Sequence, residues 1–142
     1  MPNPNDGVNF LIADVARLLR RRFAEQLRRS AVKLTLAQAR ALVYVSRREG
    51  LRQVELAAVM EVQPITLARV VDQLERAGLV ERREDPGDRR AYQLFLRPAA
   101  RAPLGRIARA SDGVRERALR GLGRAEAAAL TAALQRVHGN LA

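Results

Sequence analysis

Residues 53–97 read QVELAAVMEVQPITLARVVDQLERAGLVERREDPGDRRAYQLFLR, and this stretch decides the fold. Its first half predicts two short helices on either side of the turn Glu61-Val62, because apolar residues recur there at helical spacing. Pro64 near the start of the second helix and Gly78 just beyond its end match the usual asymmetry of helix ends. The spacing of the two helices is that of a helix-turn-helix.

The second half of the stretch predicts a β-hairpin. Residues 79–83 and the alternating run 92–96 favour paired strands, and residues 85–88, Asp-Pro-Gly-Asp, are strong turn formers. Arg89 and Arg90 follow the turn directly, so the hairpin would carry them away from the core. The predicted order is therefore a helix-turn-helix followed by a wing.

The second helix of this unit has one apolar stripe, which leaves its opposite face free. Near its start that face would present short or polar groups: Ile65 could contact a thymine methyl, Thr66 could donate a hydrogen bond, and Arg69 could reach a guanine or a phosphate. An ordinary solvent-exposed helix face remains the alternative. The residues expected to contact DNA are Gln63, Pro64, Ile65, Thr66, Arg69, Arg83, Asp88, Arg89 and Arg90.

Amphipathic helices are expected on both sides of this unit. One begins near Val8 and continues to about residue 33, and others occupy residues 98–142. Thr35 and Gln38 match a capping box that opens a helix after Thr35. Glu126 is placed to cap the last helix, whereas Gly105 suggests a kink or a close approach in the helix before it.

The chain is strongly basic, but its charge is unevenly distributed. The 142 residues include 26 Lys and Arg against 15 Asp and Glu, a net charge of +11. Seven positive and two negative charges fall in residues 8–33, eleven and nine in residues 34–98, and seven and two in residues 99–124. Such a protein attracts polyanions, chiefly nucleic acid. Specific contacts must nevertheless come from individual residues, because the central unit carries only +2.

Several functional classes are excluded or disfavoured by composition. Cysteine is absent and His138 is the single histidine, so no thiol chemistry is available and neither a metal centre nor a cofactor is expected. No nucleophile–base pair, carboxylate dyad or phosphate-binding glycine loop can be assembled, so we do not expect an enzyme. The chain has no run of 18 apolar residues and no signal-like start, which predicts a cytoplasmic, nucleoid-associated protein without membrane contact.

With these motifs identified, the chain resembles the MarR family of bacterial winged-helix transcription regulators, and within it the SlyA-like members. The segment from Leu56 to Leu96 is similar to the reading head of that family, including the spacing of Asp88, Arg90 and Leu96 in the wing. Arg97 stands where the family pattern usually has threonine. The expected fold is therefore mostly α-helical with a small β-hairpin wing.

The resemblance implies one domain, residues 1–142, in which residues 34–97 form the winged helix-turn-helix and residues 8–33 and 98–142 form dimerisation helices. It implies a homodimer bound to a pseudo-palindromic operator, with each recognition helix in a major groove and each wing in a minor groove. Asp88 would orient Arg89 or Arg90. A repressor or anti-silencer is the expected role.

Many family members also respond to a small aromatic acid, for which Arg17 and Arg21 are candidate contacts, although both equally suit a solvated helix face. The competing hypothesis is an architectural, nucleoid-associated protein that binds DNA with little sequence preference. Binding to pooled DNA at different salt concentrations separates the two, because a specific regulator keeps a large advantage at its own sites.

Overall fold

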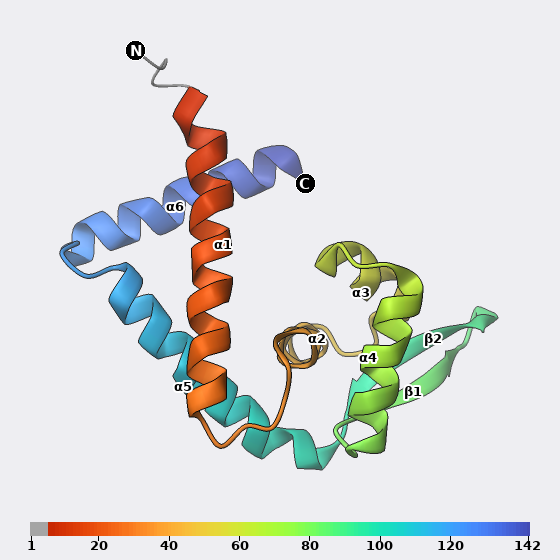
Figure 1. Cartoon of the computed structure of the whole chain (residues 1–142). Helices are drawn as coiled ribbons and strands as arrows, with labels where there is room; N and C mark the ends of the chain where they lie inside the picture. Colours follow the sequence, from red (N-terminus) through yellow and green to blue (C-terminus); the bar gives the residue numbers. More distant parts are fainter. Residues whose placement is uncertain (1–5) are drawn as a thin grey trace.

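A computed structural model describes residues 6–142 of the chain (Figure 1). A head, α2 to β2, lies on one side of the molecule, and α1, α5 and α6 lie on the other. The elements in order are α1 (Asp6–Arg29), α2 (Leu36–Arg47), α3 (Gln53–Met60), α4 (Pro64–Arg76), β1 (Val80–Asp85), β2 (Asp88–Leu96), the 3-10 turn η1 (Pro98–Ala100), α5 (Arg101–Ala118) and α6 (Arg124–Leu141). The mostly helical winged fold is thus confirmed. No helix in residues 6–142 has the length and apolarity needed to cross a membrane.

The expected helix ends are present. Thr35 caps α2 by accepting a hydrogen bond from the backbone of Gln38 at 3.2 Å, and the Gln38 side chain accepts one from the Thr35 backbone at 2.9 Å. Pro64 opens α4, and Gly78 follows its end with φ +74°, a left-handed conformation that glycine adopts without steric cost. Glu126 accepts a hydrogen bond from the backbone of Gly123 at the start of α6.

The turn between α3 and α4 contains a strained residue. Glu61 ends α3 with φ 55° and ψ 42°, the only non-glycine residue of the described chain with positive φ. A side chain in this conformation costs about 1–2 kcal/mol. The turn therefore keeps the left-handed geometry usually given to glycine, and the burial of Leu56, Ala57 and Met60 beside it holds that geometry in place.

The hairpin is longer than the sequence indicates. The strands pair from Val80↔Leu96 to Asp85↔Asp88, so pairing continues to the turn instead of stopping at residues 83 and 92. Leu51 extends the sheet locally, because its carbonyl accepts a hydrogen bond from the backbone of Leu94 at 3.0 Å. The base of the wing is therefore attached to the segment that leads into α3.

The core joins the head to α1 and α5. Its largest fully buried side chains include Leu42, Leu56, Leu67, Leu74, Leu94 and Ile107. The stripe expected on α4 is buried as predicted, with Leu67, Val70, Val71 and Leu74 facing inward. This packing fixes which side of α4 is free.

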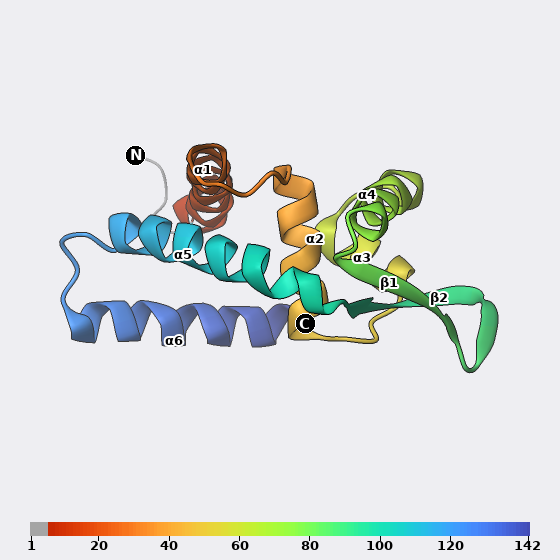
Figure 2. The same ribbon diagram turned by 90° about the horizontal axis from the view of Figure 1, so that it is seen from below.

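The C-terminal helices behave differently from each other. α5 runs unbroken through Gly105 and packs Ile107 and Val114 inside the chain. After a turn, α6 returns in the opposite direction to α5, as Figure 2 shows, yet none of its residues is buried. Most isolated helices depend on the packing of an apolar face for their stability, and nothing in residues 6–142 buries a side chain of this 18-residue helix.

Candidate nucleic-acid interface

The free start of α4 is the first part of the site. Gln63, Pro64, Ile65, Thr66 and Arg69 are all exposed, and Ile65 is 67% exposed. Gln63 occupies the N-cap position but makes no side-chain hydrogen bond to the helix. The backbone N–H groups that follow Pro64 therefore lack a side-chain cap, at the end of the helix where the macrodipole favours anions. By contrast, the N-terminus of α2 is capped by the side chains of Thr35 and Gln38.

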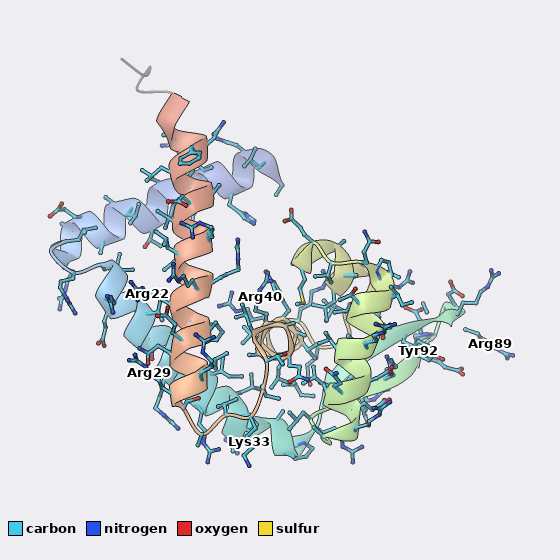
Figure 3. The ribbon with its side chains drawn as sticks, viewed as in Figure 1. Arg22, Arg29, Lys33, Arg40, Arg89 and Tyr92 are labelled. Carbon is cyan, nitrogen blue, oxygen red and sulfur yellow. The ribbon has the colours of Figure 1, made fainter. Side chains whose placement is uncertain are left out.

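The tip of the wing is the second part. Asp88, Arg89 and Arg90 are exposed at the start of β2, and Figure 3 shows Arg89 at the outer end of the hairpin, pointing away from the body. The arginines of the hairpin that form salt bridges in the described chain are Arg82, Arg83 and Arg97. The guanidinium groups of Arg89 and Arg90 are thus available for another anion.

Asp88 contacts the backbone of the wing and not a guanidinium group. One of its carboxylate oxygens accepts a hydrogen bond from the backbone N–H of Arg90 at 2.9 Å, and it forms no salt bridge with either tip arginine. Asp88 therefore shapes the backbone from which the arginines extend, and their side chains stay free to adjust.

Arg83 is held within the hairpin. It forms a salt bridge with Glu81, its Nε donates a hydrogen bond to that carboxylate at 2.6 Å, and its guanidinium lies 3.9 Å from the centre of the Phe95 ring. The structure thus separates Arg83 from the free arginines at the tip, although the sequence grouped them. A contact with DNA would require Arg83 to share or break these interactions.

Sequence reasoning did not identify two residues that position the site. Asp85 is 7% exposed and lies at the base of the turn, where it accepts hydrogen bonds from the backbone of Gly87 and from Arg52, each at 2.8 Å. Arg82, with a side chain 16% exposed, reaches α3 and α4. The alternation of strand residues contained the signal for Arg82, since Val80 on the same face is fully buried.

The hydrogen bond from the Gly87 backbone, together with Arg52, holds the pKa of Asp85 below its ordinary value of 3.8, against the opposing effect of burial. A lowered folded-state pKa stabilises the fold at pH values above the unfolded pKa, and this contribution disappears as the pH falls through the folded value. Asp85→Asn keeps an oxygen for Gly87 but removes the charge that faces Arg52. We expect this variant to be less stable than the parent at pH 7, with a gap that narrows below pH 3.8.

Urea unfolding of both proteins at a series of pH values measures that gap. Asp88→Asn is the matched control, because it removes one exposed wing carboxylate that forms no salt bridge in the described chain. A stability difference between parent and Asp85→Asn that stayed constant down to the acid limit would contradict the role assigned to the Asp85 charge.

Comparison with known proteins identifies the arrangement. The sequence profile of the MarR family matches residues 34–92, which include α2, α3, α4 and most of the hairpin. The head is a MarR-family domain. The match to the family covers the head with its free α4 start and its wing, so the sequence resemblance is confirmed.

Individual proteins similar to this chain extend the comparison. A Thauera aromatica protein described as a transcriptional regulatory protein for the hcr operon is 39% identical over 69 residues, a match that covers 49% of this chain and 42% of that protein. The solved structure of transcriptional regulator PA3341 is 32% identical, with 94% of this chain and 97% of that chain covered and a TM-score of 0.77. The transcriptional regulator SlyA is 25% identical, with 94% and 93% covered and a TM-score of 0.75.

A cavity of about 590 Å³ lies between α1, α2 and α5. Its lining combines apolar and cationic side chains, among them Phe23, Tyr44, Leu104, Arg40, Arg47 and Arg115. Figure 3 marks Arg40 on α2. The cavity does not include Arg17 or Arg21, which instead form salt bridges along α1 with Asp14 and Glu25.

Proposed function

We propose that this protein is a homodimeric, sequence-specific DNA-binding transcriptional regulator. The uncapped, exposed start of α4 enters the major groove, and the free arginines of the wing enter the neighbouring minor groove. The observation that carries this proposal is the combination of both features on one head whose remaining surface is close to electrically neutral. A general attraction to DNA would need no such placement.

Each proposed contact has a distinct chemical task. Ile65 meets a thymine methyl, Thr66 donates to a base edge, and Arg69, one turn later, binds a guanine or a phosphate. Gln63 and Pro64 bring the backbone N–H groups near a phosphate. Arg89 and Arg90 suit a narrow minor groove, where the negative potential is enhanced. Arg83 contributes only if it leaves Glu81.

In the proposed dimer, the apolar surfaces of α1 and α6 are buried against a second copy of the chain. Phe10 and Leu11 on α1 are 75% and 62% exposed, and Leu130 and Leu134 on α6 are 42% and 44% exposed. The N-terminal half of α1 and the whole of α6 lie apart from α4 and the wing in Figure 1, which leaves the start of α4 and the wing free. This arrangement supports the proposed division into a reading head, residues 34–97, and dimerisation helices, residues 8–33 and 98–142.

Dimerisation also explains where the charge lies. Two chains of +11 give a dimer of +22, and most of that charge is carried by the helices that flank the heads. Their field raises the rate of encounter with DNA over a Debye length of about 8–10 Å, whereas the heads supply the selective contacts. The two functions are therefore separated within the chain.

The cavity between α1, α2 and α5 is the proposed place for an effector. Phe23 and Tyr44 offer flat apolar surfaces, and Arg40 and Arg47 offer cationic groups at the same opening. A small aromatic carboxylate matches this combination. Its binding between dimerisation helices and head would change the spacing of the two heads, on which simultaneous contact with both half-sites depends.

Selection of bound sites from random DNA, with and without benzoate, tests the proposal. We expect a pseudo-palindromic site with half-sites separated by about one helical turn, and a weaker preference when benzoate is present. Uniform affinity for all sequences that is lost at moderate salt concentration would instead support the architectural alternative, for which the basic α1 and α5 are the favouring observation.

Thr66→Ala tests the major-groove contact. Loss of one hydrogen bond to a base edge is expected to relax the preference at one base pair in each half-site and to cost about 1–3 kcal/mol of discrimination there. Repeating the DNA selection with the variant and comparing the base frequencies at each position measures this effect. An unchanged preference at every position would show that Thr66 does not read a base.

A further inference from the structure

Arg82 forms polar contacts between the wing and the recognition helix. It lies on β1, and α4 lies across the base of the hairpin (Figure 1). Its guanidinium contacts Asp72 Oδ1 at 2.6 Å and Glu75 Oε1 at 3.2 Å through the same nitrogen, and it donates to the carbonyl of Ala68 at 3.1 Å. All three acceptors belong to α4.

The same residue reaches α3 and has a second link to α4. Its Nε donates to the Gln53 side chain at 2.9 Å, and its backbone N–H donates to Glu75 Oε2 at 3.2 Å. The side chain is 16% exposed, and its guanidinium carbon lies 6.0 Å from the centre of the Tyr92 ring. A planar guanidinium presents its donors in fixed directions, so these bonds restrain orientation as well as distance.

We propose that Arg82 is a positioning residue that sets the angle between the recognition helix and the wing, so that major-groove and minor-groove contacts are made in one register. This inference rests on the DNA-binding function proposed above. Arg82 would not contact a base. It would act by limiting the positions from which Arg89 and Arg90 can reach the minor groove.

The geometry favours Arg82 over other candidates for this role. A two-stranded hairpin has little stability of its own, so the orientation of the wing depends on what its base contacts. Arg52 and Asp85 secure the turn to the start of α3. In the described chain, Arg82 is the wing side chain that forms salt bridges with α4, the helix that carries the proposed major-groove contacts.

Two substitutions change the net charge in opposite directions, and each weakens the contact between Arg82 and α4. Arg82→Met removes one positive charge, whereas Asp72→Asn removes one negative charge and weakens the shortest contact of Arg82. If only net charge mattered, the first would weaken DNA binding and the second would strengthen it. If Arg82 positions the wing, both should reduce the preference for the minor-groove bases that the wing reads. We expect a loss of about tenfold for Arg82→Met and a smaller loss for Asp72→Asn.

The affinity of each variant is measured for the selected operator and for a form altered only at the wing positions. Arg97→Met is the charge-matched control, because Arg97 also lies at the end of the hairpin but is exposed and bridges only to Glu81 at 3.9 Å. It should weaken binding to both DNAs equally. Thermal unfolding of every variant identifies any loss caused by a smaller folded fraction, which would lower both affinities together.

A second measurement does not depend on DNA. Because the sequence contains no cysteine, spin labels can be placed at Glu84→Cys on the wing and Ala77→Cys after α4. The distribution of label distances should broaden in Arg82→Met and stay narrow in Arg97→Met. An unchanged distribution, or a full wing-dependent preference retained in Arg82→Met, would overturn the positioning role. If the parent itself selected no operator, the proposed function would fail, but the distance measurement would still decide whether Arg82 orients the wing.

Discussion

Operator affinity is expected to fall about a hundredfold or more when Leu130→Asp and Leu134→Asp are introduced together. Both side chains lie on the apolar stripe of α6. They are 42% and 44% exposed, and no element in residues 6–142 buries them. Two carboxylates at a dimer contact would have to lose their hydration, which disfavours association. Without the partner the two heads no longer bind as one unit, and the gain from simultaneous attachment, about 10²–10⁴, is lost.

Sedimentation gives the mass of the variant, and fluorescence anisotropy gives its affinity for the whole operator and for a single half-site. We expect a monomer that binds a half-site as the parent head does. Ala129→Asp together with Ala132→Asp is the matched control, because it adds two carboxylates on the other side of α6. A variant that remained dimeric would rule out α6 as a dimer contact, and a monomer with parental operator affinity would rule out the need for two heads.

The second large effect is expected at the wing tip. Arg89→Ala together with Arg90→Ala should weaken operator binding by about tenfold or more and reduce its salt dependence by about 1 for each phosphate contact that is lost. Arg89 and Arg90 are exposed and form no salt bridge in residues 6–142, so their substitution breaks no ion pair in that part of the chain. The folded stability should therefore stay close to that of the parent.

Titrations of parent and variant over a series of salt concentrations measure both quantities. Arg76→Ala with Arg97→Ala serves as the control, since it removes the same charge from exposed positions away from the tip. The assignment of the tip to the minor groove would be wrong if the double wing variant bound as tightly as the parent at every salt concentration. If the double wing variant lost no more operator affinity than the control, the tip would contribute only a general electrostatic attraction.

Local features of the fold were predictable from neighbouring residues. The capping box of α2, the proline and glycine that bound α4, and the buried stripe of α4 all follow from interactions between residues up to four positions apart. The turn residue Glu61 was the exception in this range. Its sequence neighbours could not show that it adopts positive φ, because the surrounding helices impose that conformation.

The roles of the wing arginines needed the folded chain. Arg82 and Arg83 are adjacent, but they lie on opposite faces of β1, so one bonds to α4 and the other stacks on Phe95. Asp88 likewise bonds to the backbone of Arg90 and not to a guanidinium. The sequence alone does not distinguish these roles, because each role depends on which element the side chain faces in the folded chain.

The sequence by itself determined the order of the helices and strands, the free face of α4 and the family resemblance of the head, because periodicity, caps and turn residues act over a few positions. Only the tertiary structure decided how the site is held together. Arg82 reaches Gln53 across 29 positions and Arg52 reaches Asp85 across 33, distances in sequence over which no local pattern specifies a partner. The exposed surface of α6 was decided in the same way, since the burial of an apolar stripe also requires another element to pack against it.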